Sequence, residues 1–160
     1  MSDQLPPGPG VKGPMERFEE YLRSHKLRMT PERRSVLDTI LDREGHFDAE
    51  ELLQFTRRRN KRVSRATLYR TLEHLRLAGL VKMHRFGSGH ALFEHVYGRK
   101  HHDHMVCNTC GSVIEFMNED IERLQGEVCR HHGFRSTSHV MQIFGVCGSC
   151  QSREGGTATE

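Results

Sequence analysis

The sequence predicts an α+β protein, with an N-terminal winged helix-turn-helix domain and a smaller C-terminal α/β domain stapled by a zinc site of four cysteines. Three observations predict it. Apolar residues recur at helical spacing up to residue 78, two strand-like segments then flank a glycine-rich tip, and two Cys-x-x-Cys pairs bracket the remainder. At 160 residues the chain has room for one domain of ordinary size or for two small ones, and two small domains would each need a staple or a partner.

Four helices are expected in the N-terminal part, because its apolar residues lie behind recognisable helix starts. The first covers residues 16–26, where Phe18, Tyr21 and Leu22 share one face. The other three begin at side chains that can cap a helix, namely Thr30 before Pro31, Asp48 three residues before Glu51, and Ser64. Gly79 is expected to end the fourth helix.

After Gly79 the pattern changes from helical to strand-like. Residues 80–85 and 90–96 flank Gly87-Ser88-Gly89, which predicts a β-hairpin with a glycine-rich tip. Helices followed by one hairpin are the layout of a winged helix-turn-helix, which we place at residues 15–93. Residues 1–14, rich in Pro and Gly, are expected to form a disordered arm.

Residues 94–150 are expected to form the second domain, followed by a tail at residues 151–160. The predicted elements are strands at 105–106 and 113–116, a helix from Glu119 to His132 capped by Asn118, and a strand from Phe134 to Phe144.

The composition excludes several classes of protein. No run of 18 apolar residues exists, so a membrane span is not expected, and the N-terminus lacks the apolar stretch of a secretory signal. Five Cys without an export signal indicate metal binding rather than disulfides. The expected class is a cytoplasmic metalloprotein that does not bind a membrane.

Charge divides the chain in two. Residues 15–85 hold 17 Lys and Arg against 11 Asp and Glu, whereas residues 86–150 hold 5 against 7. A basic front half and a slightly acidic, His-rich back half indicate two tasks on one chain.

The fourth predicted helix has two different faces. Leu68, Leu72 and Leu75 form an apolar stripe, and the other side carries Arg65, Tyr69 and Arg70. Basic side chains neutralise phosphates, and an exposed Tyr offers a ring and a donor to base edges. An ordinary solvated helix face is the alternative, but the winged layout and the basic run at residues 57–62 favour DNA binding.

Two cysteine pairs, Cys107 with Cys110 and Cys147 with Cys150, predict a structural zinc site. Four thiolates complete a tetrahedral zinc with no open position, so such a site supports the fold rather than a reaction. A thioredoxin-like redox motif is the alternative, and it lacks its βαβ context here. Cys129 is expected to pack as a small apolar residue on a helix.

The tetrapeptide His101-His102-Asp103-His104 can supply two further metal sites. In an extended segment alternate residues face opposite sides, so His102 and His104 point one way while His101 and Asp103 point the other. Such mixed ligands suit iron, zinc, manganese or cobalt. A plain exposed His-rich loop is the alternative.

Taken together, the motifs resemble those of the ferric uptake regulator (Fur) family of bacterial metal-dependent transcription factors, over residues 27–150. The matching segments are Arg28-Met29-Thr30-Pro31 with Arg33, Ala66-Thr67-Leu68-Tyr69-Arg70, Phe93-Glu94, His101 to His104, the Cys107 knuckle through Phe116, and His139. The resemblance implies a winged helix followed by an α/β dimerisation domain. It also implies that the protein is a repressor and not an enzyme.

The resemblance further implies three metal sites and a DNA-reading set. The structural zinc takes Cys107, Cys110, Cys147 and Cys150. The regulatory ion takes His46, Glu94, His102 and His104, with Glu115 as a fifth ligand. An additional site takes His101, Asp103, Glu122 and His139, and the DNA-binding residues are Arg33, Arg65, Tyr69 and Arg70.

The implied mechanism is a metal switch in a homodimer. An ion that prefers one geometry fixes both winged helices at the spacing of two operator half-sites. Two departures from other branches favour iron: the peroxide-sensing branch typically has Asp where this chain has Glu115, and zinc sensors often place a Cys where Glu94 stands. Fe(II) is therefore the expected regulatory ion, with Mn(II), Zn(II) and peroxide sensing as alternatives within the family.

Two rival classes lie outside the family. A non-haem metal enzyme would need an open coordination position and a substrate pocket, and the sequence indicates neither. A zinc-dependent interaction module would use the cysteine pairs but leave Tyr69, Arg70 and the wing without a role.

Overall fold

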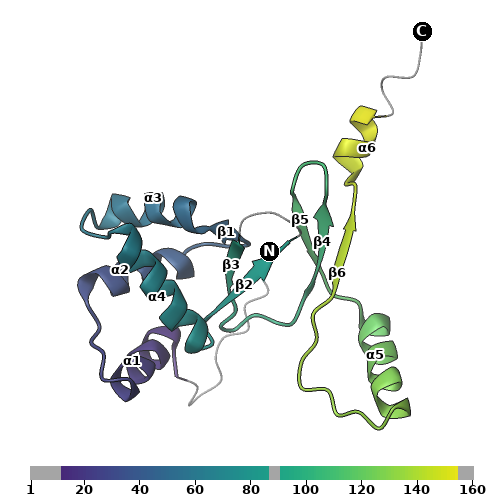
Figure 1. The fold of residues 1–160 in the computed structure, drawn as a ribbon, viewed down its shortest axis with the longest axis horizontal. Coiled ribbons are helices and arrows are strands. Elements are labelled where there is room, and N and C mark those ends of the chain that lie inside the picture. The colour runs from purple at the N-terminus through teal and green to yellow at the C-terminus, as the bar shows by residue number, and fades with distance from the viewer. Residues whose placement is uncertain (1–11, 87–90, 155–160) are drawn as a thin grey trace. The chain divides into compact units, whose positions relative to one another are not determined.

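The computed structural model describes residues 12–86 and 91–154, which separate into two compact units between Lys100 and His101 (Figure 1). We refer to them as unit 1 and unit 2. The expected domain boundary between Phe93 and Glu94 lies inside strand β3 (Ala91–His95). This strand pairs along its whole length with β2 (Val81–Arg85), so both residues belong to unit 1.

Unit 1 contains the four expected helices: α1 (Pro14–Ser24), α2 (Pro31–Leu41), α3 (Ala49–Arg59) and α4 (Arg65–Leu77). The three predicted caps are confirmed. The side chains of Thr30, Asp48 and Ser64 each accept a hydrogen bond from the backbone N–H three residues on, at 3.3, 2.7 and 3.1 Å. Pro14 begins α1 and so does not belong to the expected arm, of which residues 1–11 lie outside the described residues.

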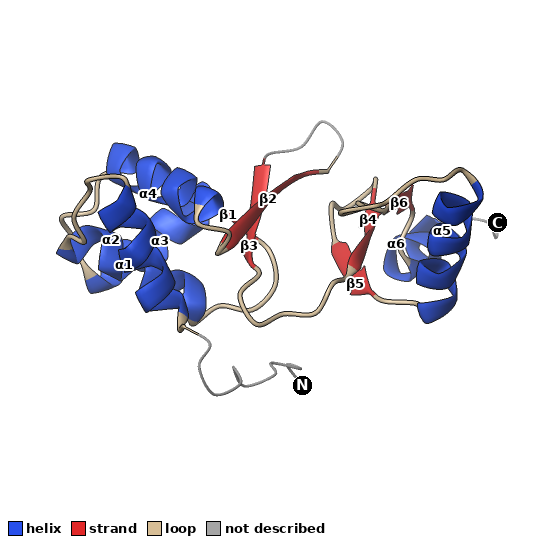
Figure 2. Cartoon of the chain, turned by 90° about the horizontal axis from the view of Figure 1, so that it is seen from below, coloured by secondary structure: helices blue, strands red, loops and turns tan. Residues whose placement is uncertain are grey.

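The core of unit 1 lies where the four helices meet each other and the sheet (Figure 2). Each helix contributes buried side chains, including Phe18, Val36, Leu52 and Leu72. Thr56 and Thr71 are also buried, because each hydroxyl donates to the carbonyl four residues earlier in its own helix. The periodicity of the sequence therefore identifies the buried faces of this unit.

The predicted hairpin is confirmed as the antiparallel pair β2 and β3, while its tip, Gly87-Ser88-Gly89, lies outside the described residues. Gly79 ends α4 with a φ of 68°, a conformation that other residues rarely adopt. A two-residue strand that the sequence did not predict, β1 (Phe47–Asp48), pairs with β3 and gives the order β1-β3-β2.

Unit 2 is a three-stranded sheet with two helices (Figure 1). Strand β4 (Asp103–Cys107) is central, with β5 (Val113–Phe116) antiparallel on one side and β6 (Gln142–Gly145) parallel on the other. Helix α5 (Glu119–His131) is capped by Asn118 as predicted, and α6 (Gly148–Glu154) follows β6.

The structure differs from two expectations for unit 2. The strand expected over residues 134–144 is confined to β6, because β4 is short and pairs only with residues 142–145. The expected tail at 151–160 begins with helical residues. The carbonyl of Cys147 accepts hydrogen bonds from the backbone N–H groups of Cys150 and Gln151, so the turn of the cysteine pair continues into α6.

No helix within residues 12–86 and 91–154 combines the length and the apolar character needed to cross a membrane.

Candidate metal centres and DNA-binding helix

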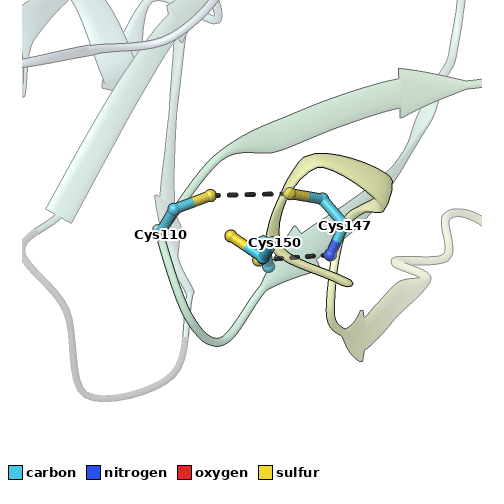
Figure 3. Close-up of side chains that lie close together, drawn as sticks. Cys110, Cys147 and Cys150 are labelled. Atoms are coloured by element: carbon cyan, nitrogen blue, oxygen red, sulfur yellow. Dashed lines mark hydrogen bonds between the residues drawn. The ribbon is translucent and has the colours of Figure 1, made fainter. Parts of the chain in front are cut away.

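The four predicted zinc ligands lie together in unit 2. Their sulfur atoms are all within 4.8 Å of one another. Cys107 ends β4, Cys110 follows in the next turn, and Cys147 and Cys150 lie at the start of α6. Figure 3 shows the sulfur atoms of Cys110 and Cys147 facing each other, at 3.7 Å. Zinc–sulfur bonds of about 2.3 Å in a tetrahedron place the sulfurs about 3.8 Å apart, so the cluster fits this ion.

The pKa values of the four-cysteine cluster are also consistent with a bound cation. The backbone N–H groups of Cys147 and Cys110 donate to the sulfur of Cys107 and lower its pKa to about 6. The neighbouring sulfur of Cys147, followed by burial, raises the pKa of Cys150 to about 12. Without an ion, at least one proton therefore stays in the cluster. A divalent cation replaces it by balancing the charge of the thiolates.

A second set in unit 2 consists of His101, Asp103, Glu122 and His139, whose ligand atoms also lie within 4.8 Å of one another. The Nε2 atoms of both His lie 3.3–3.7 Å from Asp103 Oδ1 and Glu122 Oε1. Three of these atoms, on Asp103, Glu122 and His139, are buried without a hydrogen-bond partner among the described residues. Buried polar atoms that face each other at such distances fit a shared metal ion.

The expected regulatory ligands of unit 1, His46 and Glu94, lie close together beside the hairpin of β2 and β3. Glu94 on β3 is only 1% exposed, and its Oε2 lies 3.7 Å from Nε2 of His46, which precedes β1. The structure adds a residue that the sequence reasoning missed. Nε2 of His84 on β2 lies 2.7 Å from Oε1 of the same carboxylate. The predicted hairpin could have indicated this contact, because His84 and Glu94 lie on the same face of the sheet once the strand register is known.

The expected regulatory ligands of unit 2 gather around β4. The rings of His102 and His104 lie 5.0 Å apart, and His104 is buried. Glu115 is the register partner of His104 on β5, and its Oε2 lies 3.8 Å from Nε2 of His102. Each unit therefore presents nitrogen and oxygen donors close together, and neither set includes a thiolate.

The expected DNA-reading residues occupy the outer surface of unit 1. Leu68, Leu72 and Leu75 of α4 are buried, while Tyr69 is 47% exposed and Arg70 is exposed beside it. Among the described residues Arg70 forms no ion pair, whereas Arg65 pairs with Glu50 at 2.7 Å. The ring and guanidinium of Tyr69 and Arg70 are thus presented to solvent on one side of the helix.

The basic run at residues 57–62 has a partly structural role. Arg57 donates to the carbonyl of Val63 at 3.0 Å, Arg58 lies over the ring of Phe55, and Arg59 pairs with Asp42. Arg33, the remaining expected DNA contact, donates from its guanidinium to the carbonyl of Arg28. These contacts hold the positive charges at fixed positions on the surface.

Comparison with known proteins matches residues 24–144 to the Ferric uptake regulator family. A ferric uptake regulation protein of Campylobacter jejuni is 39% identical over 142 residues, covering 88% of this chain and 90% of the relative. One of Neisseria meningitidis is 35% identical over 142 residues, covering 87% and 98%.

Solved structures agree. The Helicobacter pylori ferric uptake regulator, described as having three functional metal-binding sites, aligns with a TM-score of 0.80 at 28% identity, covering 86% of this chain and 91% of that one. The regulator of Pseudomonas aeruginosa, solved with manganese, aligns with a TM-score of 0.70 at 35% identity, covering 81% and 96%.

Proposed function

This chain belongs to the ferric uptake regulator family, and from that premise we propose that it is an iron-responsive repressor that binds operator DNA as a homodimer. Members of this family are metal-responsive, DNA-binding transcriptional regulators and not enzymes. We propose that the chain acts in the cytoplasm, where the ions that it binds alter its affinity for DNA.

In this proposal Cys107, Cys110, Cys147 and Cys150 hold a structural zinc. The support is the distance between sulfurs and the closed set of four thiolates. When bound, the zinc supplies a cross-link between the end of β4 and the start of α6. The set of His101, Asp103, Glu122 and His139 holds an additional divalent ion, supported by its unpartnered buried atoms.

The regulatory ion is proposed to join His46 and Glu94 of unit 1 to His102, His104 and Glu115 of unit 2. Each set alone is short of a full coordination shell, and each consists of the donors that suit Fe(II) or Mn(II). An ion held by both sets would favour one arrangement of the winged helix and so change the affinity for operator DNA. Linkage requires that operator DNA tighten metal binding by the same factor.

The proposed operator contacts are made by Tyr69 and Arg70 of α4, with Arg33 and Arg65 as further basic contacts. The proposed dimer forms through unit 2, which exposes many large apolar side chains. They include Leu124, Val128, Phe134, Val140, Ile143 and Phe144. Both β5 and β6 are also edge strands of the sheet, and an exposed apolar edge is a common site of self-association.

The use of iron rests on one observation. All four cysteines of the two pairs belong to the closed cluster, and the fifth, Cys129, lies on α5, so the regulatory sets contain nitrogen and oxygen donors only. Thiolate-free sets of this kind favour Fe(II) or Mn(II) over softer ions. Family sensors of zinc often place a Cys where this chain has Glu94.

A titration of operator binding tests the proposal. Ferrous or manganous ion is added anaerobically to the wild type, His104→Ala and His101→Ala, and binding is followed by gel shift. We expect His104→Ala to lose metal-activated binding while zinc content and dimer are retained. His101→Ala, whose ring faces the other set, should have a milder effect. A wild-type response of His104→Ala would show that the regulatory ion binds elsewhere.

A further inference from the structure

We propose that His84 is a positioning residue of the regulatory metal site, which donates a hydrogen bond to Oε1 of Glu94 and so orients the carboxylate whose Oε2 binds the ion. The proposal rests on the proposed function, in which Glu94 is a metal ligand. It adds a residue that does not itself bind the metal.

The two imidazoles near Glu94 contact opposite oxygens of its carboxylate. His84 Nε2 lies 2.7 Å from Oε1, which is a normal hydrogen-bond distance. His46 Nε2 lies 3.7 Å from Oε2, which is too long for a hydrogen bond but suits two ligands of one ion. An ionised carboxylate oxygen only accepts, so Nε2 of His84 carries the proton in this contact and that nitrogen has no lone pair for a metal.

The hairpin fixes this contact. Lys82 lies opposite Glu94 and His84 lies opposite Leu92, so His84 and Glu94 are diagonal neighbours on the same face of the antiparallel pair. The register therefore brings the imidazole to the carboxylate without any change in the backbone.

Phe86 fixes the rings. Its ring stacks on that of His84, with centroids 5.4 Å apart and planes 4° apart, and meets the edge of the His46 ring at 5.6 Å. His84, Phe86 and Glu94 are all largely buried, so water competes weakly for the hydrogen bond. The same aromatic ring thus holds both imidazoles around one carboxylate.

Positioning of this kind raises metal affinity because the ligand side chain loses less conformational freedom when it adopts its bound orientation. Loss of such an outer partner costs about 10–100-fold in metal affinity. His84 is expected to act at this level, while loss of a direct ligand removes the ion.

The experiment measures Mn(II) binding by the full-length, zinc-loaded protein without DNA, through competition with a chelator. The variants are His84→Leu, which removes the donor, and His84→Gln, whose amide retains an N–H near the position of Nε2. Glu94→Gln identifies the regulatory ion, and His131→Leu is the matched control at the exposed end of α5. Zinc content and circular dichroism establish that each variant is folded.

We expect His84→Leu to bind the same number of ions as wild type with about 10–100-fold weaker affinity at the regulatory site. His84→Gln should recover part of that loss, and His131→Leu should bind as wild type. If His84→Leu does not fold, His84→Gln is compared with His84→Asn, whose shorter amide should bind Mn(II) more weakly.

Three results would overturn the inference in different ways. Wild-type affinity of His84→Leu, with an ion lost in Glu94→Gln, rejects the role of His84 and leaves the proposed function standing. Loss of the whole ion in both His84→Leu and His84→Gln makes His84 a ligand rather than a positioning residue. Wild-type binding by Glu94→Gln rejects the proposed site and this inference together.

Discussion

The two units of the chain are held together in different ways. Unit 1 has a continuous apolar core to which all four of its helices and the sheet contribute. In unit 2 the buried apolar residues are Val106, Cys107 and Cys150, and α5 has no buried residue at all, among the residues that the structure describes. Two of the three buried residues are themselves proposed zinc ligands.

The two units therefore obtain their stability from different sources. Burial of apolar side chains is the main favourable term in folding, and in unit 1 the four helices and the sheet bury their apolar side chains together. In unit 2 most large apolar side chains are exposed, and four cysteine thiols lie in one cluster. We therefore expect its folding to depend on a bound ion and on a second copy of the chain.

The largest effect is expected when the cysteine cluster is broken. Replacing Cys107 and Cys110 by Ser should release zinc, unfold unit 2 and abolish the dimer, while unit 1 keeps its helices. Zinc analysis, sedimentation and amide hydrogen exchange measure these changes. Cys129→Ser is the control and should retain its zinc. A zinc-free variant that remains a well-folded dimer would show that the folding of unit 2 does not depend on a bound ion.

A smaller effect is expected from shortening matched leucines in the two units. Leu72→Ala removes a side chain that is 2% exposed and should lower the free energy of unfolding of unit 1 by about 2–5 kcal/mol. Leu124→Ala, at 51% exposed, should change the folding of a single chain by about 0.5 kcal/mol or less.

Denaturant unfolding followed by circular dichroism measures the first change, and sedimentation equilibrium measures dimer dissociation. Leu124→Ala is expected to weaken the dimer and Leu72→Ala to leave its interface intact. Equal losses of unfolding free energy in both variants would mean that unit 2 has a core of its own.

An effect smaller than that of Leu72→Ala is expected on DNA binding when a single charge is removed. Arg70→Ala should weaken operator binding by about 1–3 kcal/mol if its guanidinium contacts a base. Arg123→Ala in α5 of unit 2 is the control, since its guanidinium pairs with Asp120 and Glu127. Fluorescence anisotropy with operator DNA measures both. Equal losses would assign the effect to net charge rather than to contact by Arg70.

The sequence predicted the two units unequally well, for the same physical reason. In unit 1, buried faces repeat at helical spacing and the caps at Thr30, Asp48 and Ser64 mark helix starts, so local patterns agree with the fold. In unit 2, Phe134 and Val140 fit an alternating strand but are exposed. The sequence pattern does not distinguish an apolar residue that is buried against a partner from one that is buried in the core.

The candidate sites show a similar division. The spacing of the cysteine pairs was enough to place four thiols in one cluster, because each pair forms a tight turn. His84 could not be identified from spacing alone. Its contact with Glu94 depends on the register of the hairpin, and the residues at the tip, which set that register, do not specify it uniquely.

Strand β4 has a consequence for insertions and deletions. Within five residues it carries Asp103, His104 and Cys107, one from each of the three proposed metal sites. Successive side chains on a strand face opposite ways, so removing one residue between Asp103 and Cys107 would turn part of the strand over relative to its neighbours. A single lost codon there would damage more than one metal site at once. The length of this short strand is therefore under stricter constraint than the identity of its exposed residue, Met105.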